Sequence, residues 1–395
     1  MITILEDNKY CCGCEVCYNV CPKKAIILKK DINGFVVPQI NQLKCIDCKI
    51  CKDACPVQKR INGYLPTNDL QLAYAFRNQY NNIVTHSTSG AASYTFAEHI
   101  LKKKGVVFGV CWGKNFKVEH QAIKKFDDLY LIQGSKYVQS SINDCYKQAK
   151  EFLKNGQLVY FTGTPCQIAG LKSYLKIDYS NLITQDCICH GVPSPGLWRK
   201  YLKDTYGSRL PDEIVFRKKK NEIGWEGGGN FAVRYGSRWK LEHYVQNLYF
   251  RLFMNNWLLR SSCFYCQFKT GKFESDVTCA DLWGIKDLLP DIKDDRGMSL
   301  VLIHTEKGND LLKEIAKDNF IRSISYENAI KNNGMAIRSV KTCEHQKEFF
   351  HDMQTMDFHK AGYKYEPEDP LLLKIKKKLY PLKHNLMLLL GKRKE

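Results

Sequence analysis

The sequence predicts an α+β protein in two parts, a small cysteine-rich domain followed by a larger α/β domain. Two observations lead to this prediction. The N-terminal residues hold two copies of one cysteine pattern, and the rest of the chain alternates strand-like apolar runs with helical segments. With 395 residues and 44% hydrophobic content, the second part is long enough to bury a large core.

The cysteine pattern reads C-x2-C-x2-C-x3-C-P in both copies, at residues 11–22 and 45–56. Two-cluster bacterial ferredoxins use this spacing, in which three cysteines hold one 4Fe-4S cluster and the fourth ligates the other cluster. Zinc and a disulfide framework are the alternatives, but four thiols in eleven residues, twice, suit neither. The motif therefore predicts two clusters and one-electron chemistry. The expected ligand sets are Cys11, Cys14, Cys17 and Cys55, and Cys45, Cys48, Cys51 and Cys21.

Between the two copies, apolar runs at 25–28 and 35–38 flank Asn33-Gly34. This pattern predicts a hairpin with a type I′ turn. Cys12 lies outside the ligand spacing, and we interpret it as a bystander.

The formal charge is +19, from which each oxidised four-thiolate cluster removes about two units. A basic surface favours acidic partners such as an acidic ferredoxin or another one-electron carrier. Nucleic acid is not expected as a partner, because no recognised binding motif is present. The chain begins without a signal-peptide pattern, and its eighteen cysteines carry cluster spacing, so we expect a reducing cytoplasm.

The domain prediction is a ferredoxin-type domain at 1–62, a linker at 63–71, and one catalytic domain in two parts at 72–155 and 156–340. A basic tail follows at 341–395. Within the catalytic domain we expect strands at 105–110, 157–161, 182–184 and 187–188, and helices at 94–102, 142–153 and 166–175.

Three turns of this domain suit an anion or cofactor. They lie at 87–92, 134–140 and 162–167, where small and hydroxyl residues precede predicted helices. Simple helix capping is the alternative for each.

Six further motifs point to a particular protein family. They are STSGAAS (87–93), GSKYVQSS (134–141), FTGTPCQIAGL (161–171), CHGVPSP (189–195), RSSCFYCQFK (260–269) and DVTCADLWG (276–284). With the double cysteine pattern, they resemble the family of flavin-containing beta subunits of deazaflavin-reducing hydrogenases and dehydrogenases. That family also includes hydroxymethyl-chlorophyll reductases, and many bacterial members occur among surface-polysaccharide genes. The resemblance covers roughly residues 1 to 300.

The resemblance implies a third 4Fe-4S cluster in the catalytic domain. Its implied ligands are Cys166, Cys189, Cys263 and Cys266. Buried structural thiols are one alternative. The other makes Cys166 a nucleophile at a helix N-terminus with His190 as its base. The cysteines left over are interpreted as packing residues: Cys12, Cys111, Cys145, Cys187, Cys279 and Cys343.

The resemblance also implies FAD, held at Ser89, Gly90, Lys136, Gly163 and Thr164. The chain departs from the common family pattern at Ala91, where a second glycine is usual and where a methyl group would crowd a phosphate. It also departs at Cys279-Ala280, where glycine is common before Asp281. A third departure is Lys218, where Asp often follows Phe216-Arg217, and this residue suggests a different substrate charge.

Three other segments have two interpretations each. The loop at 225–230 closes over a substrate or forms a plain hairpin turn. The basic run at 217–220 binds an anionic substrate or forms a solvated face. The basic, Leu-rich segment at 371–395 lies on an anionic membrane, at the inner face, or docks on its own domain as a helix.

The resemblance implies an iron-sulfur flavin-dependent oxidoreductase. Single electrons would pass between ferredoxin-type clusters and FAD, with hydride transfer to or from an organic substrate or a deazaflavin coenzyme. Surface polysaccharide biosynthesis is the expected setting. The main alternative is an electron-transfer subunit that only relays electrons to a partner enzyme. A third hypothesis is an iron-sulfur protein whose α/β domain binds nucleic acid or a carbohydrate precursor without redox change.

Overall fold

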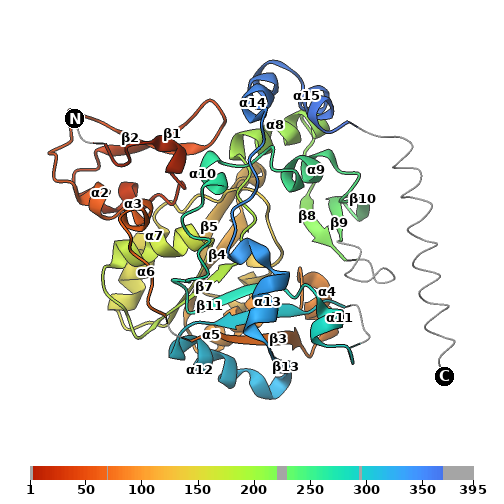
Figure 1. Cartoon of the computed structure of the whole chain (residues 1–395). Coiled ribbons are helices and arrows are strands. Elements are labelled where there is room, and N and C mark those ends of the chain that lie inside the picture. Colours follow the sequence, from red (N-terminus) through yellow and green to blue (C-terminus); the bar gives the residue numbers. More distant parts are fainter. Residues whose placement is uncertain (1–2, 69, 220–228, 293–295, 368–395) are drawn as a thin grey trace.

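The computed structural model describes residues 3–68, 70–219, 229–292 and 296–367. Its N-terminal part is a small layer of short helices with one hairpin (Figure 1). The elements of this part are α1 (Val16–Val20), β1 (Ile26–Lys30), β2 (Val36–Ile40), α2 (Ile50–Asp53) and α3 (Pro56–Ile61).

The predicted hairpin is present, but its turn is not type I′. Strands β1 and β2 pair antiparallel, and Gly34 alone takes the left-handed conformation, at φ 80°, while Asn33 does not. A type I′ turn needs positive φ at both central residues. Instead, the Asp31 carboxylate accepts hydrogen bonds from the backbone N–H groups of Asn33 and Phe35, which closes a longer loop.

The larger part is built on a mixed sheet whose described strands run in the order β13-β3-β12-β11-β7-β6-β4-β5. Strands β4, β6, β7 and β11 form a parallel centre, and the outer pairs are antiparallel. The bounds are β3 (Leu72–Asn78), β4 (Val106–Trp112), β5 (Val118–Ile123), β6 (Val159–Thr162), β7 (Leu182–Cys187), β11 (Val277–Asp281), β12 (Ser299–Ile303) and β13 (Asn319–Ile324).

Alternate residues of the central strands enter opposite cores. In β6, Val159 and Phe161 pack with α6, α7 and the N-terminal part, whereas Tyr160 packs with α5 and α12. This alternation is the period of a strand buried on both faces. The helices of this part are α4 (Asn81–His86), α5 (Ala92–Lys102), α6 (Cys145–Lys154), α7 (Pro165–Leu175), α10 (Ser261–Phe264), α11 (Ile285–Leu288), α12 (Glu306–Glu314) and α13 (Tyr326–Asn332).

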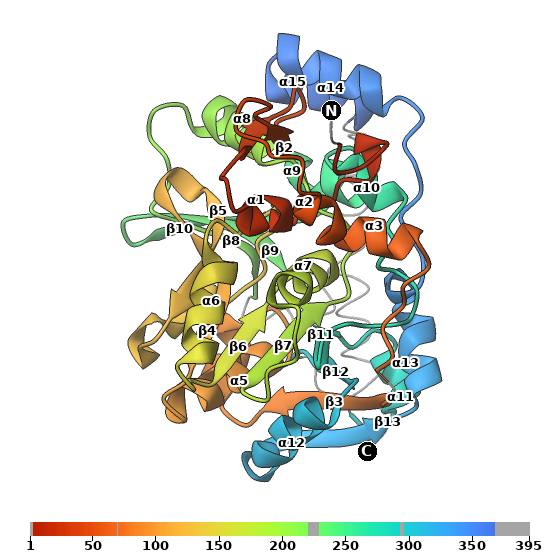
Figure 2. The ribbon, with the colours of Figure 1, turned by 90° about the vertical axis from the view of Figure 1, so that its left-hand side faces the viewer.

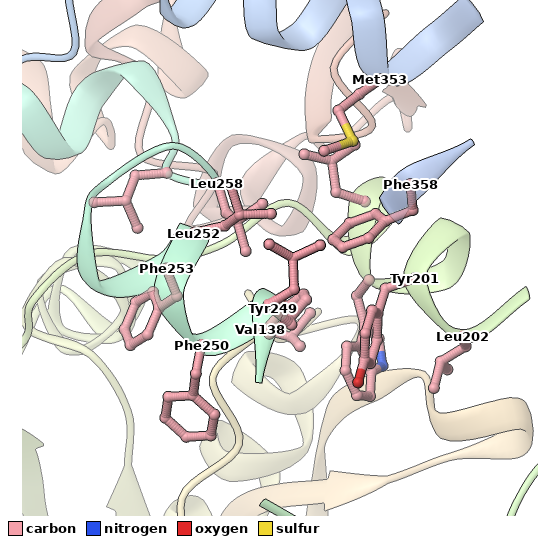
Figure 3. Packing of buried hydrophobic residues seen from close by; sticks show 14 of the residues in the cluster. Val138, Tyr201, Leu202, Tyr249, Phe250, Leu252, Phe253, Leu258, Met353 and Phe358 are labelled. Carbon is pink, nitrogen blue, oxygen red and sulfur yellow. The ribbon is translucent and has the colours of Figure 1, made fainter. Parts of the chain in front are cut away.

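An aromatic core joins a second, three-stranded sheet to four helices. Figure 3 shows side chains of these helices, such as Tyr249 and Phe358, meeting in this core. The sheet has the order β10-β9-β8. Its elements and the helices are β8 (Glu213–Lys218), β9 (Asn230–Tyr235), β10 (Arg238–His243), α8 (Pro195–Tyr206), α9 (Leu248–Met254), α14 (Gln346–Thr355) and α15 (Phe358–Tyr365). Phe349 and Phe358 of the last two helices are completely buried. The folded body therefore continues past residue 340, where the basic tail was predicted to begin.

The α+β class predicted from the sequence is confirmed. Each of the predicted strands and helices of the catalytic domain has a counterpart, although 182–184 and 187–188 are one strand, β7. Lys220, most of the 225–230 loop and the basic segment 371–395 lie outside the described residues. Among the described helices, none is long and apolar enough to cross a membrane.

Candidate functional site: three cysteine pockets and the adjoining turns

The N-terminal cysteines lie around two pockets. The first pocket is lined by Cys11, Cys14, Cys17 and Cys55, together with apolar side chains such as Leu28. The second pocket is lined by Cys21, Cys45, Cys48 and Cys51. In each pocket one cysteine comes from the opposite copy of the motif, because Cys21 and Cys55 each follow a short helix that leads the chain across. These are the two groups of four that the crossed ligand pattern predicts.

The third pocket lies between α7 and the segment around α10. It contains all four cysteines for which the resemblance implies a cluster, and about 640 Å³ of space not filled by protein. Cys166 is in the first turn of α7, Cys189 follows β7, and Cys263 is in α10. Two cysteines that the sequence analysis interprets as packing residues, Cys12 and Cys187, also line this pocket.

The thiols of these pockets fit a metal cluster in their chemistry. Burial raises the pKa of Cys55 to about 11 and that of Cys266 to about 12, so these thiolates need a nearby positive charge. Iron supplies that charge and displaces the proton. Among the described residues, no three His, Cys, Asp or Glu side chains are placed to hold a single metal ion. The C-x2-C-x2-C-x3-C-P spacing of the two N-terminal copies favours a multi-iron cluster over one zinc ion.

Helix α7 packs against α1 and α3 of the N-terminal part (Figure 2). Its N-cap residue, Thr164, forms a capping box with Gln167, and the Thr164 hydroxyl lies 3.2 Å from the Cys166 sulfur. One turn further along, Gly170 lies against Cys14, a residue of the first pocket. A Cβ atom at this glycine would lie 3.4 Å from the Cys14 sulfur and 2.8 Å from the Tyr146 hydroxyl. The missing side chain lets α7 pack directly against a first-pocket cysteine.

Two buried polar side chains clamp the start of the first motif copy. The Arg260 Nε donates to the Cys11 carbonyl at 2.6 Å, and the Gln139 Nε2 donates to the Cys12 carbonyl at 2.9 Å. A second bond of 3.0 Å joins Arg260 to Gln139. Gly13 has φ 67°, and a Cβ atom there would lie 2.7 Å from each of the two side chains, so only glycine fits.

The first two predicted cofactor turns touch each other. The Thr88 hydroxyl accepts from the backbone N–H of Ser135 at 3.0 Å. Lys136 stands beside this contact, where its ammonium donates to the carbonyls of Gln133 and Gly134 and forms no ion pair among the described residues. Burial lowers the pKa of Lys136 to about 8. A partly buried cation without a carboxylate partner fits an anionic ligand.

Contacts within the protein are enough to explain the residue types at positions 89–91, without a ligand. The Ser89 hydroxyl donates to the Met298 carbonyl at 2.6 Å, and a Cβ atom at Gly90 would lie 2.2 Å from the Phe76 carbonyl oxygen. Ala91 precedes α5 at φ 70°, in the left-handed region. This conformation explains why glycine suits the position, independently of any crowding at a phosphate. Gly163 donates its backbone N–H to the Gln185 carbonyl, at the end of β6.

The side chains of the basic run near β8 mainly contact other residues of the protein. Arg217 pairs with Asp281 at 2.6 Å, and the Lys219 ammonium donates to the carbonyls of Val84 and Ser89 at 2.8 Å each. Lys218 lies over the ring of Trp239 at 3.9 Å. A cation–π contact across the small sheet therefore accounts for the lysine at position 218.

The nucleophile alternative has no support in the geometry. The Cys166 sulfur contacts Thr164 and Cys12, and its pKa is raised by the Cys12 contact and by burial. His190 Nε2 bonds to the Asn256 side chain at 2.8 Å. The predicted base is thus engaged elsewhere, and an activated thiolate would need a lowered pKa.

Comparison with known families agrees with this geometry. Residues 156–329 match the family described as the C terminus of the coenzyme F420 hydrogenase/dehydrogenase beta subunit, and residues 10–59 match the 4Fe-4S dicluster domain. Residues 156–329 thus belong to the F420 hydrogenase/dehydrogenase beta subunit family. The chain is an iron-sulfur protein of an oxidoreductase family.

The chain is also similar to two proteins of Methanocaldococcus jannaschii. An uncharacterised polyferredoxin-like protein is 40% identical over 72 residues, which are 16% of this chain and 42% of that protein. An uncharacterised ferredoxin is 40% identical over 55 residues, which are 14% of this chain and 70% of that protein. Among solved structures, a chain of the F420-reducing nickel-iron hydrogenase complex from Methanosarcina barkeri aligns over 69% of this chain and 92% of its own length. The identity is 15% and the TM-score 0.44, too low to bear on function.

Sequence reasoning missed two residues of the site, Cys12 and Cys187. Cys12 lines both the first and the third pocket, and Cys187 lines the third pocket beside Cys189. The other leftover cysteines agree with packing roles: Cys111 and Cys145 are buried in the two cores of the large sheet, Cys279 packs against one of them, and the Cys343 thiol donates to the Asn255 carbonyl.

Proposed function

We propose that the chain is an iron-sulfur flavoprotein oxidoreductase with three 4Fe-4S clusters and one FAD. When bound, the clusters supply one-electron transfer and the flavin supplies the exchange between single electrons and hydride. The proposed substrate is a small organic molecule or a deazaflavin coenzyme, in the setting of surface polysaccharide biosynthesis that the resemblance implies. The observation on which the proposal depends is the continuity of helix α7, which contacts the first pocket, holds Cys166 of the third pocket and is capped by a predicted flavin residue, Thr164.

The residues around the second pocket suit an acidic one-electron carrier such as a ferredoxin. Cys48 is exposed, and Leu43 and Ile46 beside it are 98% and 59% exposed. Residues 21–53 contain seven lysines against three aspartates, with no arginine or glutamate. Six of these lysines are exposed and form no ion pair among the described residues: Lys23, Lys24, Lys29, Lys30, Lys44 and Lys49. Opposite charge steers a small, transient electron-transfer encounter.

The residues proposed for the flavin site would bind FAD and fix its orientation. Lys136 would hold an anionic part of FAD, and the contact between Thr88 and Ser135 fixes the two turns against each other. Gly163 and Thr164 lie at the carboxyl end of β6, the edge at which open α/β sheets bind ligands. Arg217 in β8 pairs with Asp281 at the end of β11, and this ion pair would line the substrate side.

The proposal is tested by anaerobic turnover of the chain alone. A reduced acidic ferredoxin is mixed with the protein and either a deazaflavin coenzyme or a panel of small molecules, while flavin absorbance and product are followed. The proposal predicts flavin reduction followed by catalytic product formation. A Cys266→Ala variant, which removes a third-pocket thiol, should still accept electrons from the carrier but should not reduce the flavin.

The relay alternative gives a different result in the same experiment. Clusters that take up electrons, with product formed only after a partner enzyme is added, would contradict the substrate-reducing proposal. The match to a beta subunit family supports the relay alternative, because a beta subunit works together with other subunits.

A further inference from the structure

We propose that Cys12 is a positioning residue, a thiol that bridges the first and third clusters and sets their relative reduction potentials. This inference rests on the proposed function, because it assumes that both pockets hold clusters. It concerns a residue outside the ligand spacing of the motif.

Cys12 stands between the two pockets. It lines both of them, and only 8% of its surface is exposed. Its thiol lies close enough to those of Cys14, a first-pocket residue, and Cys166, a third-pocket residue, for each to influence its pKa. The only other residue that lines both pockets is apolar, Val57, so among the described lining residues Cys12 alone offers a polar group to both sides.

The backbone holds Cys12 in place. Its carbonyl accepts from Gln139, the preceding carbonyl accepts from Arg260, and the following residue is the glycine that fits beneath both side chains. The helix that carries Cys166 packs against Cys14 through Gly170. The Cys12 thiol therefore has little freedom to leave the position between the two sulfurs.

The direction of its hydrogen bond follows from the ligation state. Cys14 and Cys166 carry no proton when they bind iron, so the S–H of Cys12 is the donor available to both sulfurs. It has one proton and two acceptors. A hydrogen bond to a ligating sulfur raises the reduction potential of that cluster. With both clusters bound, one electron would be shared between them, and the Cys12 thiol would keep its proton and be neither oxidised nor reduced.

Cys187 provides a matched comparison. It is also outside the ligand set and contacts a predicted ligand, Cys189, but it lines only the third pocket. Removal of its thiol should affect one cluster, whereas removal of the Cys12 thiol should change the balance between two.

The test is a potentiometric titration followed by electron paramagnetic resonance on the anaerobically purified full chain. The variants are Cys12→Ala, Cys12→Ser and Cys187→Ala. Signals are assigned by their loss in Cys17→Ala for the first cluster and in Cys263→Ala for the third. We expect Cys12→Ala to keep the wild-type iron content and to change the distribution of one electron between the two clusters by roughly fivefold, the effect of one net hydrogen bond. Cys12→Ser, which keeps a donor, should restore most of the distribution, and Cys187→Ala should shift the third cluster alone.

Unchanged midpoints of both clusters in Cys12→Ala and Cys12→Ser, at full iron content, would overturn the inference. Loss of about four irons in Cys12→Ala would also overturn it, because Cys12 would then be a ligand. A wild-type chain without a signal from a third cluster would instead overturn the proposed function.

Discussion

The two copies of the cysteine motif have the same spacing but different surroundings. The first copy lies against α7, where Cys14 is 6% exposed and Arg260 and Gln139 clamp the chain. The first three cysteines of the second copy lie nearer the surface, with Cys48 exposed among lysines, whereas Cys55 reaches back into the first pocket. Spacing determines which cluster a motif can hold, whereas burial and charge determine what the cluster exchanges electrons with. The inner copy suits exchange within the protein and the outer copy suits exchange with a carrier.

One pair of equivalent residues shows the difference most clearly. Glu15 and Lys49 follow the second cysteine of each copy and have the same left-handed backbone, at φ 59° and 62°. The buried Glu15 carboxylate accepts from the backbone N–H groups of Ile142 and Asn143 at 3.1 and 2.9 Å. Lys49 is exposed. The same turn thus anchors the domain in one copy and adds positive charge to its surface in the other.

The largest expected effect comes from Cys14→Ala and Cys48→Ala. Each removes one predicted ligand, so each variant should lose about four irons per chain. Because Cys14 also packs against α7, its variant should in addition lower the thermal unfolding temperature more than Cys48→Ala does. Iron analysis and a thermal melt check this prediction, with Cys343→Ala as the control. Equal melting temperatures of the two variants would contradict the inner and outer assignment.

Reversal of charge on the outer copy should have the next largest effect. The triple variant Lys23→Glu, Lys44→Glu and Lys49→Glu should slow reduction by an acidic ferredoxin about tenfold or more at low salt, because steering is lost. Stopped-flow mixing gives the second-order rate. Reduction by dithionite should remain nearly unchanged, and reversal of the remote lysines Lys317 and Lys331 serves as the matched control. A rate equal to that of the control would place carrier docking elsewhere.

The Glu15 and Lys49 pair gives a smaller effect on stability. Glu15→Ala leaves two backbone N–H groups without their acceptor and should lower the free energy of unfolding by about 1–3 kcal/mol. Lys49→Ala truncates the side chain at a position with the same left-handed backbone, but at an exposed site, and should leave the free energy of unfolding nearly unchanged. Denaturant unfolding of the anaerobic protein measures both values. A similar loss in the two variants would mean that the inner copy is not anchored through Glu15.

The smallest expected effect is on the affinity for FAD and comes from Lys136 in the catalytic domain. Its lowered pKa of about 8 means that the side chain loses its charge as pH rises through that value. Affinity for anionic FAD should therefore fall several-fold above about pH 8. Fluorescence titration of FAD across this range tests the prediction. Lys136→Met should bind more weakly and show no such step, and a wild-type step retained in Lys136→Met would assign the effect to another group.

The same folded pKa has a consequence for stability. In the unfolded chain lysine keeps its proton up to about pH 10.4, so between about pH 8 and 10.4 the unfolded state binds more protons than the native state. The contribution of Lys136 to stability is thus unfavourable below about pH 8 and becomes less so as pH rises through this window.

Local patterns of the sequence predicted much of the fold. Strand β6 and helix α7 were expected at 157–161 and 166–175, and they occur at Val159–Thr162 and Pro165–Leu175. Apolar runs and capping residues are local signals, so a single sequence reveals them. The grouping of eight thiols into two sets was also expected from spacing, and the structure places these sets in two pockets.

The features that the sequence did not predict depend on contacts between distant segments. Cys12 matters because the first motif copy docks beside Cys166, which is far away in the chain. The helices at 346–365 fall within the predicted basic tail because the residues that bury their apolar side chains are distant in the sequence. Trp257 contacts Phe349, and Tyr201 and Tyr249 contact Phe358. The Asp31 carboxylate replaced the expected type I′ turn through its own side-chain bonds.

The most direct test of the account is the content of iron, acid-labile sulfide and released flavin per chain, measured on protein purified without oxygen. Visible spectra before and after dithionite accompany the analysis. The account predicts about twelve irons, about twelve sulfides and one FAD. About eight irons with no flavin would contradict it, because the third pocket would then hold no cluster and the chain would be a ferredoxin-type domain attached to a body without redox chemistry of its own.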